Sequence, residues 1–385
     1  MRPTDNPYSP GAGSPPPELA GRDELLNQAS VAIQRIMKGR TARSLLMLGL
    51  RGVGKTVLLN RISQIAEDLD CHTVIFEADS RSTLPELLTE QLHRFLLKID
   101  RRRRVSQEVR NAFSLLRGFA GAFSVRYSDI EIGLTESQTT GDLALDLTDL
   151  LTAIAEAADS RDTTAVILID EVQFISQHDL SALVMALHRI SQRQLPLLLM
   201  GAGLPQLAGL VGEAKSYAER LFEYPLIGRL SRGNATRALV LPAKEEGVTF
   251  EEDGIELILQ ETDGYPFFIQ VWGFHAWDVA SDSPITVADV KQASKNAIAA
   301  LDAGFFRVRT DRLTKRQLDY VIALASLESI PATSTDVAKK MEETVTSVAP
   351  IRDTVIRKGV AFSPSRGMIE FTVPKFDEFV RRTFK

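Results

Sequence analysis

The sequence has only one cysteine, Cys71, in 385 residues. A single cysteine excludes an internal disulfide framework and a zinc site built from cysteines, and it fits a reducing cytoplasm. No apolar stretch approaches the roughly 18 residues that a membrane-spanning helix needs, so we expect no membrane partner. Residues 1–17 lack an apolar core and are rich in Pro, Gly and Ser, which is unlike a signal peptide and predicts a disordered tail.

The rest of the composition is that of an ordinary soluble protein, with 44% hydrophobic and 25% charged residues. The length allows two or three domains, each with its own core. The net charge of −5 is unevenly distributed, because residues 306–385 hold 15 Lys and Arg against 10 Asp and Glu. The C-terminal segment is therefore the basic part of the chain.

Residues 49–56 fit the pattern GxxxxGK[ST] of a phosphate-binding loop. The loop follows an apolar run at 44–48, which predicts a buried parallel strand, and precedes apolar residues at helical spacing from Val57 onward. A glycine-rich turn that binds nothing is the alternative, and this strand-loop-helix context disfavours it. The predicted nucleotide-binding residues are Gly49, Leu50, Arg51, Gly52, Val53, Gly54, Lys55, Thr56 and Val57.

The residue types in this loop suit the polyphosphate of ATP. Glycines let successive backbone N–H groups point inward, and the helix that opens near Gly54 adds its partial positive charge. We expect Lys55 to reach the β and γ phosphates and Thr56 to bind Mg²⁺ through its hydroxyl. ATP and Mg²⁺ are therefore the predicted cofactors.

A second apolar run, residues 165–169, ends in Asp170 and Glu171. This pattern predicts a central strand whose carboxyl end reaches the ligand. Asp170 is the predicted Mg²⁺ ligand, and Glu171 is the predicted catalytic residue that polarises the attacking water. Two solvated acids at the end of a strand are the alternative, which the phosphate loop makes improbable.

Three further apolar runs, at 72–76, 195–200 and 222–227, complete a predicted sheet. Their alternation with helical segments predicts an α/β fold with a parallel sheet of the P-loop NTPase type. The predicted ATPase domain spans residues 18–229 and includes an insertion at 79–145. Within the insertion, Arg101–Arg104 form a basic run that would suit a phosphate backbone, with a solvated helix end as the alternative. Residues 123–133 alternate like an edge strand or hairpin, which suggests a partner surface.

The order of the phosphate loop and the Asp-Glu strand resembles the AAA+ ATPases and their STAND relatives. Over residues 18–385 the chain is similar to the initiator-type AAA+ group, which includes the origin recognition complex and archaeal ATPase families. In that resemblance, the segment 18–25 packs near the adenine, and Leu19 and Ala20 form an apolar wall for the base. A loop leading into a helix capped by Asp23 is the alternative.

The same resemblance implies that Arg220 acts as an arginine finger on the nucleotide of a neighbouring subunit, with Arg229 as the fallback. A surface arginine is the alternative. The chain departs from the family pattern at two places. Phe267 stands where many AAA+ lids have an arginine, and residues 200–203 lack the usual polar sensor. Both departures predict that ATP binds but is hydrolysed slowly.

Residues 230–305 predict a small helical lid, with helices near 255–259, 267–279 and 287–301. In residues 306–385 helices are predicted at 313–327, 335–341, 347–358 and 376–384, with Ser334 as a cap. Strands at 360–362 and 368–373 predict a hairpin. This order resembles the winged helix-turn-helix that ends initiator-type proteins. The implied DNA-binding residues are Thr346, Ser347, Arg352, Arg357, Lys358 and Arg366; a protein-binding module is the alternative.

The leading interpretation is a cytoplasmic AAA+-like ATPase that binds Mg²⁺-ATP and acts as a nucleotide-controlled switch. It would bind double-stranded DNA through its C-terminal winged helix and assemble as a homo-oligomer or with a partner ATPase. Two alternatives remain, a STAND-like signalling ATPase whose winged helix binds protein, and a transposition-type or defence-type regulator that forms filaments on DNA. A metabolic kinase is disfavoured, because it needs neither lid nor helix-turn-helix.

Overall fold

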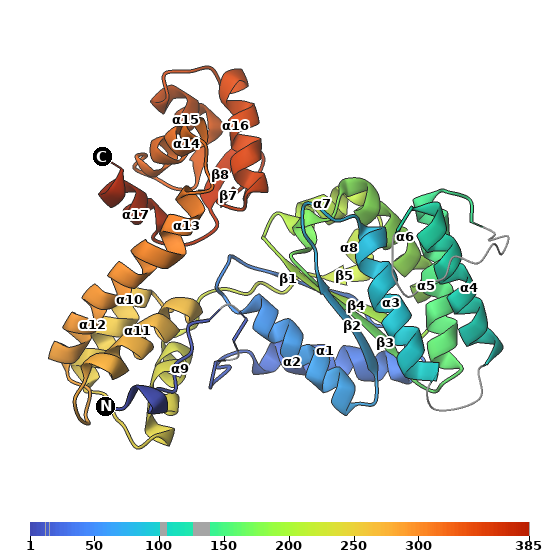
Figure 1. The fold of residues 1–385 in the computed structure, drawn as a ribbon, viewed down its shortest axis with the longest axis horizontal. Coiled ribbons are helices and arrows are strands. Elements are labelled where there is room, and N and C mark those ends of the chain that lie inside the picture. The colour runs from blue at the N-terminus through green and yellow to red at the C-terminus, as the bar shows by residue number, and fades with distance from the viewer. Residues whose placement is uncertain (12, 15, 101–105, 126–138, 385) are drawn as a thin grey trace. The chain divides into compact units, whose positions relative to one another are not determined.

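The computed structural model covers residues 1–385 and describes all of them except 12, 15, 101–105, 126–138 and 385 (Figure 1). The chain divides into two compact units. One comprises residues 24–49 and 55–226, and we call it the sheet unit. The other comprises residues 1–23, 50–54 and 227–385, and we call it the lid unit.

The sheet unit contains a five-stranded parallel sheet with the order β2-β3-β4-β1-β5. This confirms the predicted α/β fold. β4 lies between β1 and β3, so the strand that ends in Asp170 is not next to the strand that leads into the phosphate loop. The strands are β1 (Ser44–Leu48), β2 (His72–Glu77), β3 (Ala165–Asp170), β4 (Leu197–Gly203) and β5 (Phe222–Glu223).

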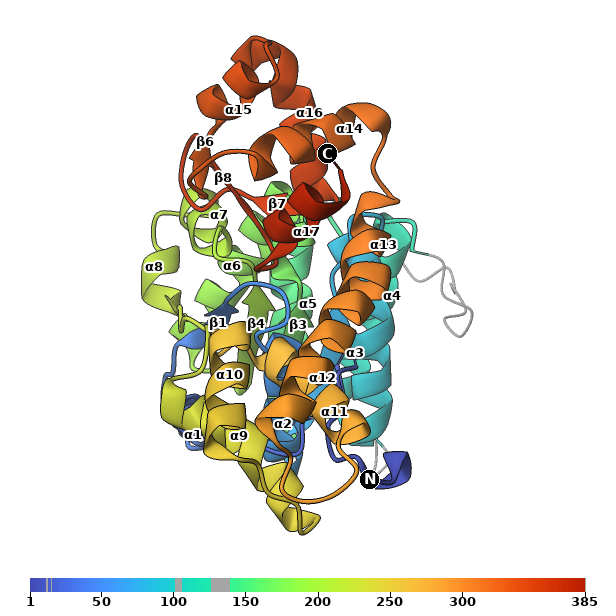
Figure 2. The same ribbon diagram turned by 90° about the vertical axis from the view of Figure 1, so that its left-hand side faces the viewer.

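Helices cover both faces of this sheet (Figures 1 and 2). The chain moves one way across the sheet from β1 to β2 and the other way from β2 to β3 and β4, so right-handed crossovers place α2 on one face and α3, α5 and α6 on the other. The helices of the unit are α1 (Asp23–Met37), α2 (Lys55–Asp68), α3 (Leu84–Asp100), α4 (Gln107–Ala122), α5 (Leu143–Asp159), α6 (Gln177–Arg193), α7 (Leu207–Ala214) and α8 (Ala218–Leu221).

The insertion at 79–145 supplies two of these helices, α3 and α4, and both pack into the core. Leu92 of α3 and Leu116 of α4 are fully buried in the same cluster as Ile167 of β3. The insertion is therefore part of the core of the sheet unit. The basic run Arg101–Arg104 and most of the predicted edge strand at 123–133 lie outside the described residues.

Between residues 230 and 300 the lid unit contains four helices, whereas the sequence patterns predicted three and did not predict the first, α9. They are α9 (Arg232–Glu245), α10 (Glu252–Thr262), α11 (Pro266–Val279) and α12 (Val287–Ala300). α11 packs against α9, α10 and α12. Its aromatic residues fill this core, and Trp272 and Phe268 are almost fully buried.

The N-terminal residues pack against these lid helices. The Tyr8 side chain is 2% exposed, its hydroxyl donates a hydrogen bond to the Leu239 carbonyl, and its ring lies where a Cβ on Gly273 would stand. The Met1 amino group donates to the Ala280 carbonyl at 2.6 Å. The packing of Met1 and Tyr8 differs from the disordered tail predicted for residues 1–17, because one buried aromatic side chain anchors a segment whose average composition is polar.

The C-terminal part of the lid unit is a small helical domain with a three-stranded antiparallel sheet of order β6-β8-β7. Helices and strands occur near their predicted places, but the N-cap of α15 is Thr333, not Ser334, because the Thr333 hydroxyl accepts the Asp336 N–H in a capping box. The elements are η3 (Leu301–Phe306), α13 (Arg307–Thr310), α14 (Lys315–Ala325), β6 (Ala332–Thr333), α15 (Ser334–Lys340), α16 (Val345–Arg357), β7 (Ala361–Phe362), β8 (Met368–Phe371) and α17 (Phe376–Thr383).

Among the helices that the structure describes, none combines the length and the apolar character needed to cross a membrane.

Candidate functional site

The carboxyl ends of β1, β3 and β4 meet at one edge of the sheet unit, because all three strands are parallel. Gly49 follows β1, and its N–H donates to the carbonyl oxygen of Gly203 at the end of β4 at 3.0 Å. Lys55, the first residue of α2, is buried, and its Nζ donates to the Gly49 carbonyl at 2.9 Å. The Lys55 side chain therefore folds back onto the loop that would surround a phosphate.

The predicted metal ligands Thr56 and Asp170 are brought together at this edge. The Thr56 hydroxyl donates to Asp170 Oδ2 at 2.5 Å, and the Glu171 N–H donates to Asp170 Oδ1 at 2.8 Å. Burial raises the pKa of the Asp170 carboxyl above its usual range, although these two hydrogen bonds oppose the shift. A hydroxyl and a carboxylate side by side are oxygen donors of the kind that Mg²⁺ takes.

Glu171 follows Asp170 with a left-handed backbone, φ 51° and ψ 39°. Its carboxylate accepts a hydrogen bond from the side-chain amide of Gln173. The amide oxygen of Gln173 accepts the N–H of Leu204, just beyond β4, at 3.0 Å. Sequence reasoning missed Gln173. The only sequence signal is a polar residue two positions after the acidic pair.

The tip of the phosphate loop, residues 50–54, belongs to the lid unit. The Phe267 N–H, in the first turn of α11, donates to the Gly52 carbonyl at 3.2 Å. The Tyr265 hydroxyl donates to the carbonyl of Arg51. Gly52 has φ +87°, and a Cβ there would lie 3.1 Å from the Tyr265 ring. Two residues of the lid therefore hold the backbone of the loop tip.

The C-terminal domain also contacts the loop tip. The Arg51 N–H donates to the carbonyl oxygen of Thr372, which follows β8, at 3.2 Å. The Arg51 guanidinium lies against Gly359, where a Cβ would stand 2.6 Å from Nη2. Gly359 follows Lys358, the C-cap of α16, and the last carbonyl groups of this helix carry partial negative charge and attract a cation.

A second arginine stands beside this contact. The rings of Phe267 and Phe305 lie 4.6 Å apart, and the Arg309 guanidinium carbon lies 4.0 Å above the Phe305 ring. Burial, and then the charge of Arg51, lower the pKa of Arg309 to about 10. Phe267 stands where many AAA+ lids have an arginine, but Arg51 and Arg309 place two positive charges at the loop tip.

The segment predicted to lie near the adenine is partly buried. Ala20 is 3% exposed, and Leu19 is half-buried. One Nη of Arg22 donates to the carbonyl oxygens of Gly228 and Val53 at 2.7 and 3.3 Å. The segment is therefore attached to the loop tip within the lid unit, and the adenine wall stays a prediction.

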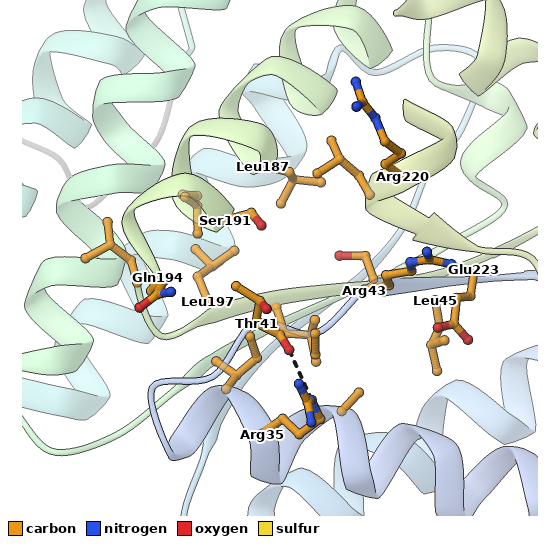
Figure 3. A pocket seen from close by; sticks show the side chains of 18 of the residues that line it. Arg35, Thr41, Arg43, Leu45, Leu187, Ser191, Gln194, Leu197, Arg220 and Glu223 are labelled. Atoms are coloured by element: carbon orange, nitrogen blue, oxygen red, sulfur yellow. Dashed lines mark hydrogen bonds between the residues drawn. The ribbon is translucent and has the colours of Figure 1, made fainter. Parts of the chain in front are cut away.

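Arg220 lies at the opposite edge of the sheet unit. It precedes β5, whose Phe222 pairs with Ser44 at the amino end of β1, about 16 Å by strand length from Gly49. Figure 3 shows Arg220 with Arg43 and Glu223 around a cavity of about 530 Å³ between α1, α6 and α8. Arg220 is exposed, and the distance excludes contact with a nucleotide in its own loop. The fallback, Arg229, pairs with Asp263.

The predicted DNA-binding residues divide into two groups. Arg352 donates to Ser363 Oγ at 2.9 Å and to the Met368 carbonyl at 3.2 Å, so it ties α16 to the β7–β8 hairpin. Lys358 donates to Gln317 Oε1 at 2.8 Å and to the Arg312 carbonyl. Both cations are engaged within the domain, which argues against a primary role in binding. Thr346, Ser347, Arg357 and Arg366 are exposed.

Comparisons with known protein families give two matches. Residues 18–200 match the model of the AAA ATPase domain. Residues 303–380 match a domain of unknown function (DUF8462). No curated protein matches the chain.

Solved structures of similar fold are remote in sequence. The Walker-type ATPase PABY2304 of Pyrococcus abyssi is 14% identical with a TM-score of 0.57, over 94% of this chain and 96% of its own. The Aeropyrum pernix Orc1 protein in complex with DNA is 16% identical with a TM-score of 0.48, over 96% and 94%. The Thermotoga maritima RuvB branch migration motor is 13% identical with a TM-score of 0.47, over 96% and 99%. The first likeness supports the fold alone.

Proposed function

Because residues 18–200 carry an AAA ATPase domain, we propose that the chain is a switch that binds Mg²⁺-ATP and hydrolyses it slowly. The donor set at the sheet edge fits these cofactors. Lys55 supplies the cation for the phosphates, and Thr56 and Asp170 supply two oxygen ligands for the metal. Mg²⁺, when bound, neutralises charge on the phosphate oxygens.

Glu171 is the proposed general base. It lies at the same sheet edge as Lys55 and Thr56, and its carboxylate takes a proton from the attacking water. Hydrolysis is slow in this proposal because β4 ends in Gly201, Ala202 and Gly203, which offer no polar side chain to the terminal phosphate.

Two hydrogen bonds of Arg51 support the proposal of a switch. The Arg51 N–H donates to the Thr372 carbonyl, and the Tyr265 hydroxyl donates to the Arg51 carbonyl. Because both backbone groups of Arg51 are bonded outside the loop, a change at the loop reaches the lid and the C-terminal domain directly. Differential contacts of this kind are what a ligand-controlled two-state element needs.

The output of the switch is proposed to be DNA binding by the C-terminal domain. Its order of helices α14, α15 and α16 followed by a hairpin supports a winged helix-turn-helix, in which α16 enters the major groove. Arg357 on α16 and Arg366 on the hairpin are exposed cations that would contact phosphates.

A protein-binding output is the second candidate, and one observation favours it. The α16 surface has few uncommitted cations, since Arg352 and Lys358 are bonded within the domain and Asp353 adds negative charge. A STAND-like signalling ATPase or a regulator of the transposition or defence type fits this observation. Arg220 would complete the nucleotide site of a neighbouring copy or of a partner ATPase in either case.

Calorimetry with ATP and Mg²⁺ tests the nucleotide claim. Lys55→Ala should abolish detectable binding, whereas the matched control Lys38→Ala, at an exposed position after α1, should bind like the wild type. Glu171→Gln should still bind ATP but turn it over at least 10-fold more slowly, in line with the loss of a general base. Unchanged binding by Lys55→Ala would end the proposal.

Fluorescence anisotropy with a DNA duplex decides between the two outputs. DNA binding should weaken steeply between 50 and 200 mM salt, because released counterions drive it. It should also differ between the ATP-bound and nucleotide-free protein. No binding at low salt in either state would reject the DNA output and favour a protein partner.

A further inference from the structure

We propose that Gln173 positions the carboxylate of Glu171, the proposed general base. This inference rests on the proposed function, because it concerns the hydrolytic step at the same site. Gln173 would act through Glu171 and is therefore a positioning residue.

The amide of Gln173 is fixed at both ends. Its oxygen accepts the Leu204 N–H at 3.0 Å, and its Nε2 donates to Glu171 Oε2. A backbone N–H can only donate, so the Leu204 contact determines which amide atom is the oxygen. The NH₂ group must then face Glu171, where only an acceptor is present.

The backbone at Glu171 is itself held in a strained conformation. Glu171 has a left-handed φ of 51°, which in a non-glycine residue persists only where surrounding contacts enforce it. The single 3-10 turn Val172–Phe174 that follows brings the Gln173 side chain back to Glu171. A hydrogen bond to the carboxylate removes rotamer freedom that a Glu side chain would otherwise keep.

The glycines at the end of β4 make room for this arrangement. A Cβ on Gly203 would lie 2.6 Å from Gln173 Oε1, and a Cβ on Gly201 would lie 2.9 Å from Val172 Cγ2. Both distances are too short for ordinary contacts. The two glycines at the end of β4 therefore leave the space that the Gln173 side chain occupies as it arrives from the β3–α6 connection.

In the hydrolytic step Gln173 keeps the Glu171 carboxylate aimed while the carboxylate takes one proton from water. The water oxygen bonds to the terminal phosphorus as the bond to the leaving phosphate oxygen breaks. The Gln173 amide neither gains nor loses a proton. Its loss should therefore lower kcat while leaving the affinity for ATP nearly unchanged.

Gln173→Met tests this role, because methionine keeps the length of the side chain and removes the amide. We expect kcat to fall 10- to 100-fold, the usual effect of losing a partner that orients a reacting group, with the Kd for ATP within about twofold of wild type. Gln177→Met, at an exposed position at the start of α6, is the matched control and should keep the wild-type kcat.

Gly203→Ala tests the same geometry while leaving residue 173 a glutamine. Its Cβ should displace the amide oxygen and lower kcat as Gln173→Met does, and the double variant should be no slower than the slower single variant. Gly209→Ala on α7 is the control, since a Cβ there meets nothing within 4 Å.

A spectroscopic test needs no nucleotide. In protein labelled with ¹⁵N-glutamine, the Gln173 side-chain resonance, assigned by its loss in Gln173→Met, should move in Glu171→Ala, and the Leu204 amide should move in Gln173→Met. A wild-type kcat in Gln173→Met, a parallel loss of kcat and ATP affinity, or an unmoved Gln173 resonance would each overturn the inference while leaving the nucleotide proposal standing. Failure of Lys55→Ala to abolish binding would overturn the nucleotide proposal by itself, and a wild-type protein without turnover would contradict both.

Discussion

The N–H of Arg51, in the phosphate loop, donates a hydrogen bond to the carbonyl oxygen of Thr372, 321 positions later in the chain, at 3.2 Å. No side chain takes part in this bond. The side chain of Arg51 adds a second contact by lying against Gly359 at the end of α16. One loop residue thus joins the nucleotide-binding element to both the β8 end and the α16 end of the C-terminal domain.

Arg51→Met should uncouple nucleotide binding from the output of the C-terminal domain. The guanidinium that lies at the C-terminal end of α16 would be lost, while the backbone bonds of the loop remain. We expect the Kd for ATP to stay within about threefold of the wild-type value. The factor by which ATP changes the affinity for DNA or a partner should fall at least fivefold. Anisotropy titrations with and without ATP measure both. An unaltered ATP effect would show that Arg51 does not transmit it.

Tyr265→Phe should loosen the loop tip. The variant removes the hydrogen bond to the Arg51 carbonyl, and a net loss of about 1 kcal/mol corresponds to roughly fivefold faster local opening. Hydrogen exchange followed by mass spectrometry should show faster exchange in peptides that span residues 50–54. Tyr217→Phe, on the sheet unit, is the control for the same chemical change. Equal exchange in Tyr265→Phe and wild type would contradict the prediction.

Magnesium-dependent binding of ATP should weaken as the pH is lowered into the acidic range, at a higher pH than an ordinary aspartate would give. Burial raises the pKa of Asp170, so the folded protein holds a proton on this carboxyl at pH values where an exposed aspartate would be ionised. A protonated carboxyl does not bind Mg²⁺, so binding must release the proton and the Kd must rise as pH is lowered. Calorimetry in two buffers of different ionisation enthalpy should detect this proton release in the wild type, and Asp170→Asn should show none from this site.

Tyr8→Ala should destabilise the lid unit. The ring is 2% exposed and faces Gly273, so its removal leaves a cavity that costs roughly 3 kcal/mol. Tyr8→Phe loses only the hydroxyl bond to Leu239 and should cost about 1 kcal/mol. Urea unfolding followed by tryptophan fluorescence reports on this region because Trp272 and Trp277 both lie in α11. Equal stabilities for the two variants would mean that the ring does not anchor the segment.

Arg352→Ala and Arg366→Ala should separate folding from binding. Arg352 bonds Ser363 and Met368, so its loss should destabilise the C-terminal domain by about 1.5–3 kcal/mol. Arg366 is exposed at the hairpin, so Arg366→Ala should leave the stability unchanged. Arg366→Ala should also weaken binding to a DNA duplex, and it should lower the slope of the log binding constant against log salt concentration by about one. Thermal unfolding and a salt series of anisotropy titrations measure the two effects.

Local patterns in the sequence were enough to predict the sheet and the candidate ligands. The runs at 44–48 and 165–169 are buried strands because nearly every residue in them is apolar, and parallel pairing then brings Asp170 to Thr56. Parallel strands end at the same edge of a sheet, so this meeting of residues can be predicted without knowing which distant side chains touch.

The contacts that sequence reasoning missed depend on residues far apart in the chain. Tyr8 pairs with Leu239, and Arg51 pairs with Thr372 through the backbone, whose atoms are the same in every residue. Gln173 lies close to Glu171 in sequence, but its second partner is the Leu204 N–H, and the room for it comes from Gly203. The arrangement is readable only once β3 and β4 are known to be neighbours.

Arg220 and the phosphate loop lie at opposite edges of the sheet unit. The arginine lies at the amino edge of the sheet and the phosphate loop at the carboxyl edge, so the proposed finger and the proposed phosphate site of one copy lie at opposite ends of its sheet. If Arg220 completes the nucleotide site of a neighbouring copy, as proposed, copies can stack head to tail, and each interface then completes one site. An open stack always ends in one incomplete site, whereas a closed ring has none. The fraction of complete sites, and with it the turnover per chain, would then report directly on how many copies have assembled.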